Sequence, residues 1–463
     1  MIIRQFYIDG PGCLSYLVGC EHHGLAIVID PDRYVDPYIE LADRLNLEII
    51  GVVDTHLHTD HISGNRELAN LTGAEIFLPE KAQATFDHTS IITGDILEAG
   101  NVRLKVIPTP GHTPESISLL AWDETRGNTP FAIFTGDALH VGDVGKPEGD
   151  TPEANETLAR QLYHSVFHIL GELPESVIVY PGHAAGGACG KGGGSIRLST
   201  LGYEIKTSPI FYLANETAFV DYVTTQQPDR PANFYRVRNI NRRGASLVGT
   251  VTPAPLSLKE AVHYLARGAA MIDTRPKAAF KAKHAHGAVH LELGHALSKR
   301  AGYVLYPEET IVLLLEHADT YEAAFWGLAR VGYDNIVGYL EGGIEAWEAG
   351  GFPVTAGDVE DVSPTTAFEM LQNGNQAQFI DVREPWEYIQ AHPPGARLIP
   401  LGELPQRLEE LDPERPVVVI CNSGNRSQTA AGILGQNGFQ KVYNVLDGII
   451  GWMEKGLPVE QGE

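Results

Sequence analysis

Histidines and carboxylates gather in four short motifs in the first half of the chain. The densest motif is His-Leu-His-Thr-Asp-His at 56–61, which follows apolar β-forming residues at 49–53. The other three motifs end in His112, Asp137 and His183, each with a glycine directly before that residue. Imidazoles and carboxylates are common ligands of zinc and iron, and a cluster of them is costly unless it binds something. The motifs therefore predict a metal site at the ends of strands.

The ordered series His-x-His-x-Asp-His, His, Asp, His resembles the metallo-β-lactamase superfamily. The candidate ligands are His56, His58, Asp60, His61, His112, Asp137 and His183. The resemblance covers about half of the chain, and it implies an αβ/βα sandwich with the metal at the sheet edges. His140, His164 and His168 match no position of the series, and we interpret them as structural.

Two interpretations of the metal site stay open, because the superfamily divides here. If all seven positions bind metal, the site resembles glyoxalase II, in which two zinc ions and a bridging hydroxide hydrolyse a thioester. If only His56, His112 and Asp137 bind, the site resembles the persulfide dioxygenases, with one Fe(II) per chain and three positions open for substrate and dioxygen. In that case the other four side chains, His58, Asp60, His61 and His183, orient ligands or handle protons.

A cysteine follows a second predicted buried strand, at 417–420. Cys421 opens a short loop that leads into a predicted helix at 427–435. Backbone N–H groups and a helix N-terminus favour the thiolate over the thiol, so Cys421 is a candidate nucleophile. Arg426 offers a fork of donors to an anion above the loop. The other residues of the predicted sulfur-binding loop are Asn422, Ser423, Gly424, Asn425 and Ser427.

The Cys-x-x-Gly-x-Arg loop resembles the rhodanese family, whose cysteine carries sulfane sulfur as a persulfide. Asp381-Val382-Arg383 and the segment 448–452 fit other signatures of that family. The six residues from Cys421 to Arg426 have the length of a sulfur-carrying loop. Two places depart from the usual family residues: the run His392-Pro393-Pro394-Gly395 has a proline in place of an aliphatic residue, and Gly448-Ile449 replaces Gly-Gly. Neither lies in the loop.

An internal repeat covers the second half of the chain. Asp273-Thr274-Arg275 matches the motif at 381–383 with an offset of 381 − 273 = 108, and 343–347 matches 448–452 with an offset of 105. Strands alternate with helices in each copy, which predicts two small doubly wound α/β domains. We therefore predict three α/β domains: 1–245, 252–356 and 360–463.

The first copy lacks the sulfur-carrying side chains. The position of Cys421 falls on Leu315, and the following segment contains Glu316 and Asp319 but no arginine. These carboxylates would repel an anionic sulfur donor. We predict that this copy is inactive and that its motifs at Asp273 and Trp347 maintain the fold.

Composition limits the partners. The chain has 463 residues, 43 % hydrophobic residues and a formal charge of −25. A field of that sign repels nucleic acids. The N-terminus lacks a signal-peptide pattern, and no apolar run is long enough for a membrane span. Four scattered cysteines indicate a reducing compartment, so we expect a cytoplasmic protein with no membrane partner.

The two resemblances together imply an enzyme of sulfide detoxification. The N-terminal domain would oxidise a low-molecular-weight thiol persulfide, of glutathione, coenzyme A or a similar thiol, with dioxygen to sulfite. Cys421 would move sulfane sulfur, and sulfite and sulfur together would give thiosulfate. The alternatives are a glyoxalase II-like hydrolase with two zinc ions, for which a sulfur-carrying cysteine has no evident use, and a sulfur-responsive interaction protein without catalysis.

Several residues near these motifs have secondary roles in the hypothesis. Cys189 is a candidate for a second sulfur-handling residue near the iron, whereas Cys13 and Cys20 are expected in the core. Three cations are candidates for holding the anionic arm of the thiol carrier or for a solvated surface role: Lys146, Lys191 and Arg197. The identity of the carrier, the direction of sulfur flow and homo-oligomerisation stay open.

Overall fold

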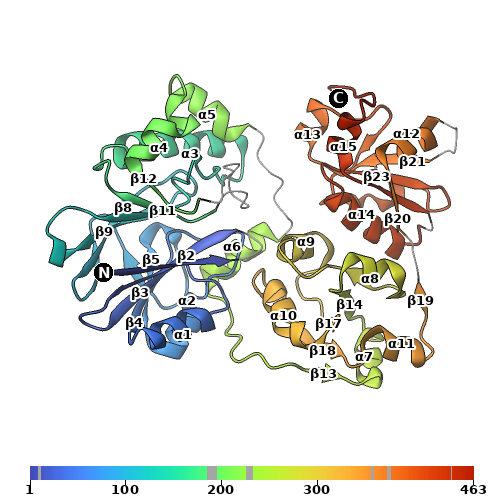
Figure 1. The fold of residues 1–463 in the computed structure, drawn as a ribbon, viewed down its shortest axis with the longest axis horizontal. Coiled ribbons are helices and arrows are strands. Elements are labelled where there is room, and N and C mark those ends of the chain that lie inside the picture. The colour runs from blue at the N-terminus through green and yellow to red at the C-terminus, as the bar shows by residue number, and fades with distance from the viewer. Residues whose placement is uncertain are drawn as a thin grey trace. The chain divides into compact units, whose positions relative to one another are not determined.

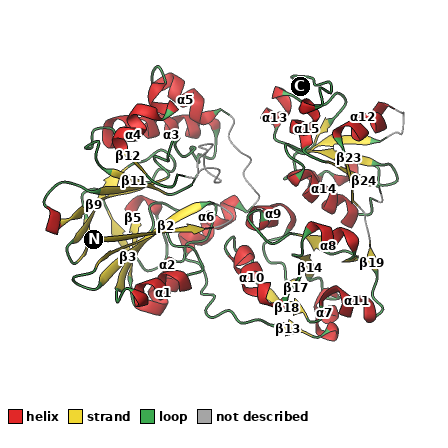
Figure 2. Ribbon diagram, viewed as in Figure 1, coloured by secondary structure: helices red, strands yellow, loops and turns green. Residues whose placement is uncertain are grey.

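The computed structural model describes residues 1–8, 12–184, 196–225, 233–355, 359–372, 377–439 and 441–462. The chain forms two compact units (Figures 1 and 2). Unit 1 contains Met1–Gln227, Phe234–Thr250 and Arg330–Gly332, and unit 2 contains the remaining residues.

Unit 1 contains two six-stranded mixed sheets. The first has the order β1-β2-β3-β4-β5-β6 and the second β12-β11-β10-β9-β8-β7. The strands of the first sheet are β1 (Ile2–Ile8), β2 (Cys13–Cys20), β3 (Leu25–Ile29), β4 (Glu48–Val53), β5 (Glu75–Pro79) and β6 (Thr89–Ile91). Those of the second are β7 (Ile96–Ala99), β8 (Val102–Pro108), β9 (Ile117–Asp123), β10 (Ala132–Gly136), β11 (Ile178–Pro181) and β12 (Ser199–Thr200).

Three apolar layers hold these sheets together. Side chains from both sheets, among them Tyr16, Ile27, Leu104 and Phe134, form the central layer. The outer face of the first sheet packs on α1 (Asp36–Arg44) and α2 (Asn65–Thr72). The outer face of the second packs on α3 (Pro152–His164), α4 (Leu201–Thr207) and α5 (Glu216–Thr224), and α6 (Phe234–Arg243) completes the helices of the unit. This arrangement confirms the predicted αβ/βα sandwich.

Unit 2 contains two parallel five-stranded sheets with the same strand order. The first is β13-β18-β17-β14-β16 and the second is β20-β24-β23-β21-β22. Strands of the first are β13 (Pro255–Leu256), β14 (Ala270–Asp273), β16 (Val289–His290), β17 (Ile311–Leu314) and β18 (Ile336–Leu340), beside a small pair of β15 (His284–Ala285) and β19 (Val354–Thr355). Strands of the second are β20 (Val359–Val362), β21 (Gln378–Asp381), β22 (Arg397–Leu398), β23 (Val417–Ile420) and β24 (Val442–Val445).

Helices complete each of these small α/β domains. The first contains α7 (Leu258–Leu265), α8 (Lys277–Ala282), α9 (Leu297–Val304), α10 (Tyr321–Ala329) and α11 (Gly343–Ala349). The second contains α12 (Pro364–Gln372), α13 (Pro385–Gln390), α14 (Asn425–Gln436) and α15 (Gly448–Glu454). The two predicted α/β domains are therefore confirmed, and β23 has the predicted bounds.

The repeated Asp-x-Arg motif forms the same buried ion pair in both copies. Arg383 Nη2 donates to Asp381 Oδ2 at 2.6 Å and to the Ala391 carbonyl at 2.7 Å. In the first copy the distance between Arg275 Nη2 and Asp273 Oδ2 is also 2.6 Å. The aspartates end the inner strands β14 and β21, so both pairs fix the chain as it leaves the sheet.

Candidate metal centre and sulfur loop

Three of the predicted ligands converge on one point inside unit 1. Asp137 Oδ2 lies 3.3 Å from His112 Nε2 and 3.8 Å from His56 Nε2. All three side chains are at most 2 % exposed. Within the described residues, Asp137 Oδ2 and His112 Nε2 make no hydrogen bond. Because a buried polar atom without a hydrogen bond is costly, these donor atoms fit a metal ion.

Neighbouring groups fix the tautomers of the two histidines. His112 Nδ1 lies 2.6 Å from the carbonyl oxygen of Lys146, which accepts only, so Nδ1 carries the proton. The Thr55 hydroxyl donates to Asp30 and accepts from His56 Nδ1 at 3.0 Å. Both Nε2 atoms consequently present a lone pair toward Asp137, the state that metal binding requires.

The second oxygen of Asp137 is held by two other imidazoles. His183 Nδ1 lies 2.7 Å and His140 Nε2 lies 3.1 Å from Asp137 Oδ1. Burial alone would raise the pKa of Asp137, but the adjacent imidazoles and the hydrogen bonds with His140 and His183 hold the pKa well below its usual range. The carboxylate is thus ionised, with one oxygen oriented by hydrogen bonds and the other directed at the histidines.

His140 matches no position of the ligand series, and the structure places its ring against the predicted ligand Asp137. His140 lies only three residues after Asp137, and this short spacing could have indicated the contact between the two side chains. His164 and His168 are exposed near the end of α3, with their rings 5.4 Å apart, away from this cluster.

The remaining predicted residues form an adjoining buried group. Asp60 Oδ1 lies 3.1 Å from His61 Nδ1, and Asp60 Oδ2 lies 2.8 Å from His183 Nε2. His58 Nε2 lies 3.1 Å from Asp30 Oδ1. All seven candidates therefore lie in one cluster, but they divide into separate groups of possible ligands. His183 links two of these groups, because its ring contacts both Asp137 and Asp60.

Burial keeps two of these histidines neutral. Burial and the neighbouring imidazoles together lower the pKa of His58 to about 4 and the pKa of His56 well below its usual range. Burial also raises the pKa of Asp30 and of Asp54 to about 6. Neutral imidazoles at physiological pH are ready to bind metal.

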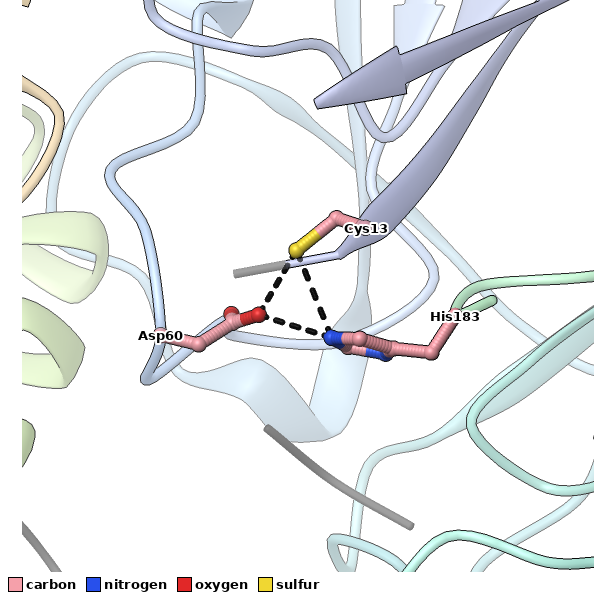
Figure 3. A group of neighbouring side chains, drawn as sticks. All are labelled: Cys13, Asp60 and His183. Carbon is pink, nitrogen blue, oxygen red and sulfur yellow. Dashed lines mark hydrogen bonds and ion pairs between the residues drawn. The ribbon is translucent and has the colours of Figure 1, made fainter. Parts of the chain in front are cut away.

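Cys13 is buried, as expected, but its thiol faces polar side chains. Its Sγ atom lies 2.7 Å from Asp60 Oδ2 and 3.3 Å from His183 Nε2 (Figure 3). The thiol is 3 % exposed. Cys20, in contrast, packs with the apolar side chains between the two sheets, as expected.

The cations proposed for a thiol carrier have different surroundings. The Lys146 ammonium is buried and lies 4.3 Å from the centre of the Tyr222 ring. Arg197 is exposed, with its guanidinium 4.1 Å from the centre of the Tyr7 ring. Cys189 and Lys191 lie outside the described residues.

The loop after β23 surrounds the second predicted reactive group. Cys421 is 1 % exposed, and its Sγ accepts a hydrogen bond from the Gly424 backbone N–H at 3.2 Å. Ser427 Oγ lies 3.3 Å from the same sulfur. Asn422 and Ser423 are exposed at the loop surface, and α14 begins at Asn425. The Gly424 N–H and the Ser427 hydroxyl are therefore both directed at the sulfur of the candidate nucleophile.

Family models match both units. The metallo-beta-lactamase superfamily model matches residues 8–183, and the rhodanese-like domain model matches 257–350 and 363–455. A crystal structure of a metallo-beta-lactamase from Staphylococcus aureus subsp. aureus COL is 33 % identical with a TM-score of 0.67, and the match covers 73 % of this chain and 98 % of that one. The chain belongs to the metallo-beta-lactamase superfamily. Two rhodanese-like domains follow its metallo-beta-lactamase domain.

Curated relatives of the metallo-beta-lactamase domain have two different activities in their names. Human mitochondrial persulfide dioxygenase ETHE1 is 30 % identical over 185 residues, which are 40 % of this chain and 68 % of that protein. A hydroxyacylglutathione hydrolase of Dictyostelium discoideum is 27 % identical over 172 residues, 36 % of this chain. The chain spans only 61 % of the length of that hydrolase. These similarities support an enzyme without selecting its substrate.

The second rhodanese-like domain pairs Arg426 with a carboxylate. Arg426 Nη1 and Nη2 each donate to Glu387 at 2.7 Å. Burial alone would raise the pKa of Glu387, but its hydrogen bonds with Arg426 and the charge of that guanidinium lower it. The Arg426 guanidinium, which we predicted to bind an anion, is therefore paired with a carboxylate of α13. In the first rhodanese-like domain, Leu315 follows β17 directly, as Cys421 follows β23.

Within the described part of the chain, every helix is too short or too polar to cross a bilayer.

Removing the Asp137 carboxylate should abolish metal binding at the candidate centre. We expect Asp137→Ala, purified without oxygen, to lose its bound metal, and His140→Ala to bind metal about 10- to 100-fold more weakly, because it removes one of the two imidazoles that orient Asp137 Oδ1. Metal content and competition with a chromophoric chelator measure both effects. His22→Ala, on an exposed turn, is the control. Full metal content in Asp137→Ala would contradict this assignment.

Breaking the Arg426–Glu387 pair should improve anion binding at the loop. We expect Glu387→Gln to lower the thiosulfate concentration for half-maximal sulfur loading of Cys421 by about 2- to 5-fold, the size of one partly exposed ion pair. Mass spectrometry of the intact protein measures the loading. Glu403→Gln, whose partner Arg407 pairs at 2.8 Å outside the loop, is the matched control. Weaker loading in a folded Glu387→Gln protein would show that the pair serves the site.

Proposed function

We propose that the chain is a persulfide dioxygenase and sulfurtransferase that holds one Fe(II). The observation that carries this proposal is the convergence of His56, His112 and Asp137, two imidazoles and one carboxylate. Fe(II) bound by such a triad keeps three positions for the persulfide sulfur and dioxygen. The overall reaction balances as RSSH + O2 + H2O giving RSH and H2SO3.

The residues around the triad have positioning roles in this proposal. His140 and His183 hold Asp137 Oδ1, which directs Oδ2 toward the metal. His58, Asp60, His61 and His183 supply the titratable groups for protons released as sulfite forms. The Lys146 carbonyl fixes the His112 tautomer. The buried surroundings exclude bulk water from these ligands.

Cys421 is the proposed carrier of sulfane sulfur. Its thiolate attacks the outer sulfur of a donor, the donor's sulfur–sulfur bond breaks, and the donor leaves as a thiolate or as sulfite. In the thiosulfate-forming direction, sulfite attacks the Cys421 persulfide, and Cys421 leaves with the electron pair. Cys189 remains a candidate for a second sulfur-handling residue. The first rhodanese-like domain, with Leu315 in place of the nucleophile, is proposed to be inactive.

The proposed substrates are persulfides of glutathione, coenzyme A or a similar small thiol, together with dioxygen and sulfite. The negative charge of the chain argues against nucleic acid, and we propose a cytoplasmic role in sulfide detoxification without membrane attachment.

The second candidate is a dinuclear zinc thioester hydrolase. Retention of all seven ligand positions favours it, as do His58 Nδ1 and His61 Nε2, buried atoms that make no hydrogen bond within the described residues. Against it, two imidazoles engage the Asp137 oxygen that would bridge a second ion. The hydrolase also leaves the rhodanese-like domains without a related reaction.

Metal analysis combined with oxygen uptake distinguishes the two functions. Protein purified without oxygen should contain one iron per chain in the triad, and it should consume one dioxygen for each sulfite formed from glutathione or coenzyme A persulfide. Asp137→Ala should abolish this uptake. Two zinc ions per chain, no uptake and hydrolysis of a glutathione thioester would instead establish the hydrolase.

The two sulfur activities should separate by mutation. We expect Cys421→Ala to abolish sulfur transfer from thiosulfate to an acceptor and to leave oxygen uptake with a supplied persulfide largely unchanged, because the thiol belongs to another domain. Cys20→Ala, a buried thiol between the sheets, is the control for loss of a cysteine. Full sulfur transfer by Cys421→Ala would remove Cys421 from the carrier role.

A further inference from the structure

Hydrogen-bonded polar side chains lead away from the sulfur of Cys421. Ser427 Oγ lies 3.3 Å from Cys421 Sγ and 2.6 Å from Asn444 Oδ1. Asn444 Nδ2 in turn donates to Asp361 Oδ1 at 2.8 Å. Cys421, Ser427 and Asn444 are each at most 1 % exposed. We call the three side chains Ser427, Asn444 and Asp361 the relay.

The Asp361 carboxylate fixes the direction of the hydrogen bonds in the relay. A carboxylate oxygen only accepts, so the Asn444 amide presents its NH2 group to Asp361 and its carbonyl oxygen to Ser427. That carbonyl oxygen also only accepts, so the Ser427 hydroxyl must donate to it. A hydroxyl has one proton, although Asn444 Oδ1 and Cys421 Sγ both lie within its reach. Asn444 and Cys421 therefore compete for the same hydrogen bond.

Two lysines of the first rhodanese-like domain hold the outer end of the relay. Lys281 Nζ lies 2.6 Å and Lys277 Nζ lies 3.3 Å from Asp361 Oδ2. Both lysines belong to α8, whereas Asp361 lies on β20 of the second rhodanese-like domain, and both domains belong to unit 2. Burial alone would raise the pKa of Asp361, but hydrogen bonds with Lys281 and Asn444 and the lysine charges lower it. The relay therefore ends in an ionised carboxylate whose charge α8 compensates.

The first rhodanese-like domain has other residue types at the positions of the relay. Ser427 falls on Tyr321 with an offset of 427 − 321 = 106. Asn444 falls on Tyr339 with an offset of 444 − 339 = 105, and the centres of the two tyrosine rings lie 5.5 Å apart. The residue paired with Tyr339 on β13 is Pro255, which has no charge. The sheet therefore forms without the relay, which accompanies the cysteine rather than the fold.

We propose that the first rhodanese-like domain acts on the sulfur site of the second through the relay. The lysines of α8 set the charge on Asp361, and Asp361 and Asn444 in turn set how readily Ser427 donates to sulfur. Asn444, Asp361 and the two lysines are positioning residues, since they act through Ser427. The inference deepens the proposed function and rests on Cys421 as the sulfur carrier.

The relay acts when negative charge develops on the sulfur. Sulfite attacks the outer sulfur of the Cys421 persulfide, the sulfur–sulfur bond breaks, and Cys421 Sγ leaves with the electron pair. The Ser427 hydroxyl then turns from Asn444 to donate to Sγ, and its proton stays on the hydroxyl oxygen. The charge of Asp361 strengthens the Asn444 carbonyl as an acceptor and so opposes this turn. The lysines of α8 weaken that opposition.

Other charged groups face Cys421 from the elements packed around it. Burial lowers the pKa of Arg300 on α9, against the charges of Glu292 and Cys421. Burial alone would also lower the pKa of Arg426, but its hydrogen bonds with Glu387 and the charges of Glu387 and Cys421 raise it. The charged groups that stay unchanged in the test below are Arg300, Glu292, Arg426, Glu384, Glu387 and the Asp381–Arg383 pair.

Alkylation of Cys421 tests the relay without relying on sulfur transfer. Full-length protein, freed of persulfide by a reducing agent, is treated with iodoacetamide over a range of pH, and mass spectrometry follows the peptide with Cys421. The thiolate is the form that reacts. We expect Lys281→Gln to slow the reaction about 2- to 5-fold and Asp361→Asn to speed it by a similar factor, the size of one partly exposed ion pair. Lys283→Gln, whose lysine pairs with Glu348 at 2.7 Å directly after α8, is the matched control.

Removal of the Ser427 hydroxyl separates the relay from a direct effect of charge. In a Ser427→Ala background, we expect both charge variants to react at the rate of Ser427→Ala alone, because the charges then have no donor to control. Persistence of the full changes in that background would overturn the proposal. Equal rates in Lys281→Gln, Asp361→Asn and wild-type protein, or changes of the same sign, would also overturn it.

The two charge variants keep the test decisive where Ser427→Ala fails to fold, because the Lys281 and Asp361 side chains are 24 % and 22 % exposed. The expected alkylation changes in a protein that transfers no sulfur would support the relay and exclude only the carrier role of Cys421.

Discussion

The Asp137 carboxylate is the group on which the arrangement of the metal centre depends. One oxygen is directed at His56 and His112, and the other accepts from His140 and His183. Burying this charge is expensive unless every lone pair is used. Four imidazoles around this buried carboxylate compensate that cost. His140 and His183 hydrogen-bond to one oxygen, and His56 and His112 face the other oxygen across the position where a cation would bind.

Two glycines allow the backbone to come close enough for four imidazoles to surround Asp137. A Cβ atom at Gly182 would lie 2.7 Å from Asp137 Oδ1, and one at Gly136 would lie 2.6 Å from the Thr55 hydroxyl. Gly136 also has a φ of 48°, a region that other residues rarely adopt. The glycine directly before Asp137 and the one before His183 are therefore steric requirements of the site. The apolar layer between the two sheets holds the strand ends at this separation.

The fold and the clustering of the candidate metal ligands could be predicted from sequence, because strands followed directly by histidine and aspartate leave a local signal. The strand before His56 and the strand before Cys421 are both found where apolar β-forming residues predict them. The contacts of Cys13 could not be predicted, because its partners lie 47 and 170 residues away and its own neighbours are apolar. The pairing of Arg426 with Glu387 likewise joins residues 39 apart, and charge alone does not reveal which anion an arginine meets.

The duplicated domains separate the requirements of the fold from those of sulfur chemistry. The Asp273–Arg275 and Asp381–Arg383 pairs have equal Nη2–Oδ2 distances of 2.6 Å. Trp347 and Trp452 each donate to a proline carbonyl six residues later, at 3.0 and 2.9 Å. Both copies build the same sheet with these contacts, although one presents leucine and the other cysteine after the central strand. The two copies therefore share the ion pair and the tryptophan as parts of one frame, whereas the residue that follows the central strand differs between them.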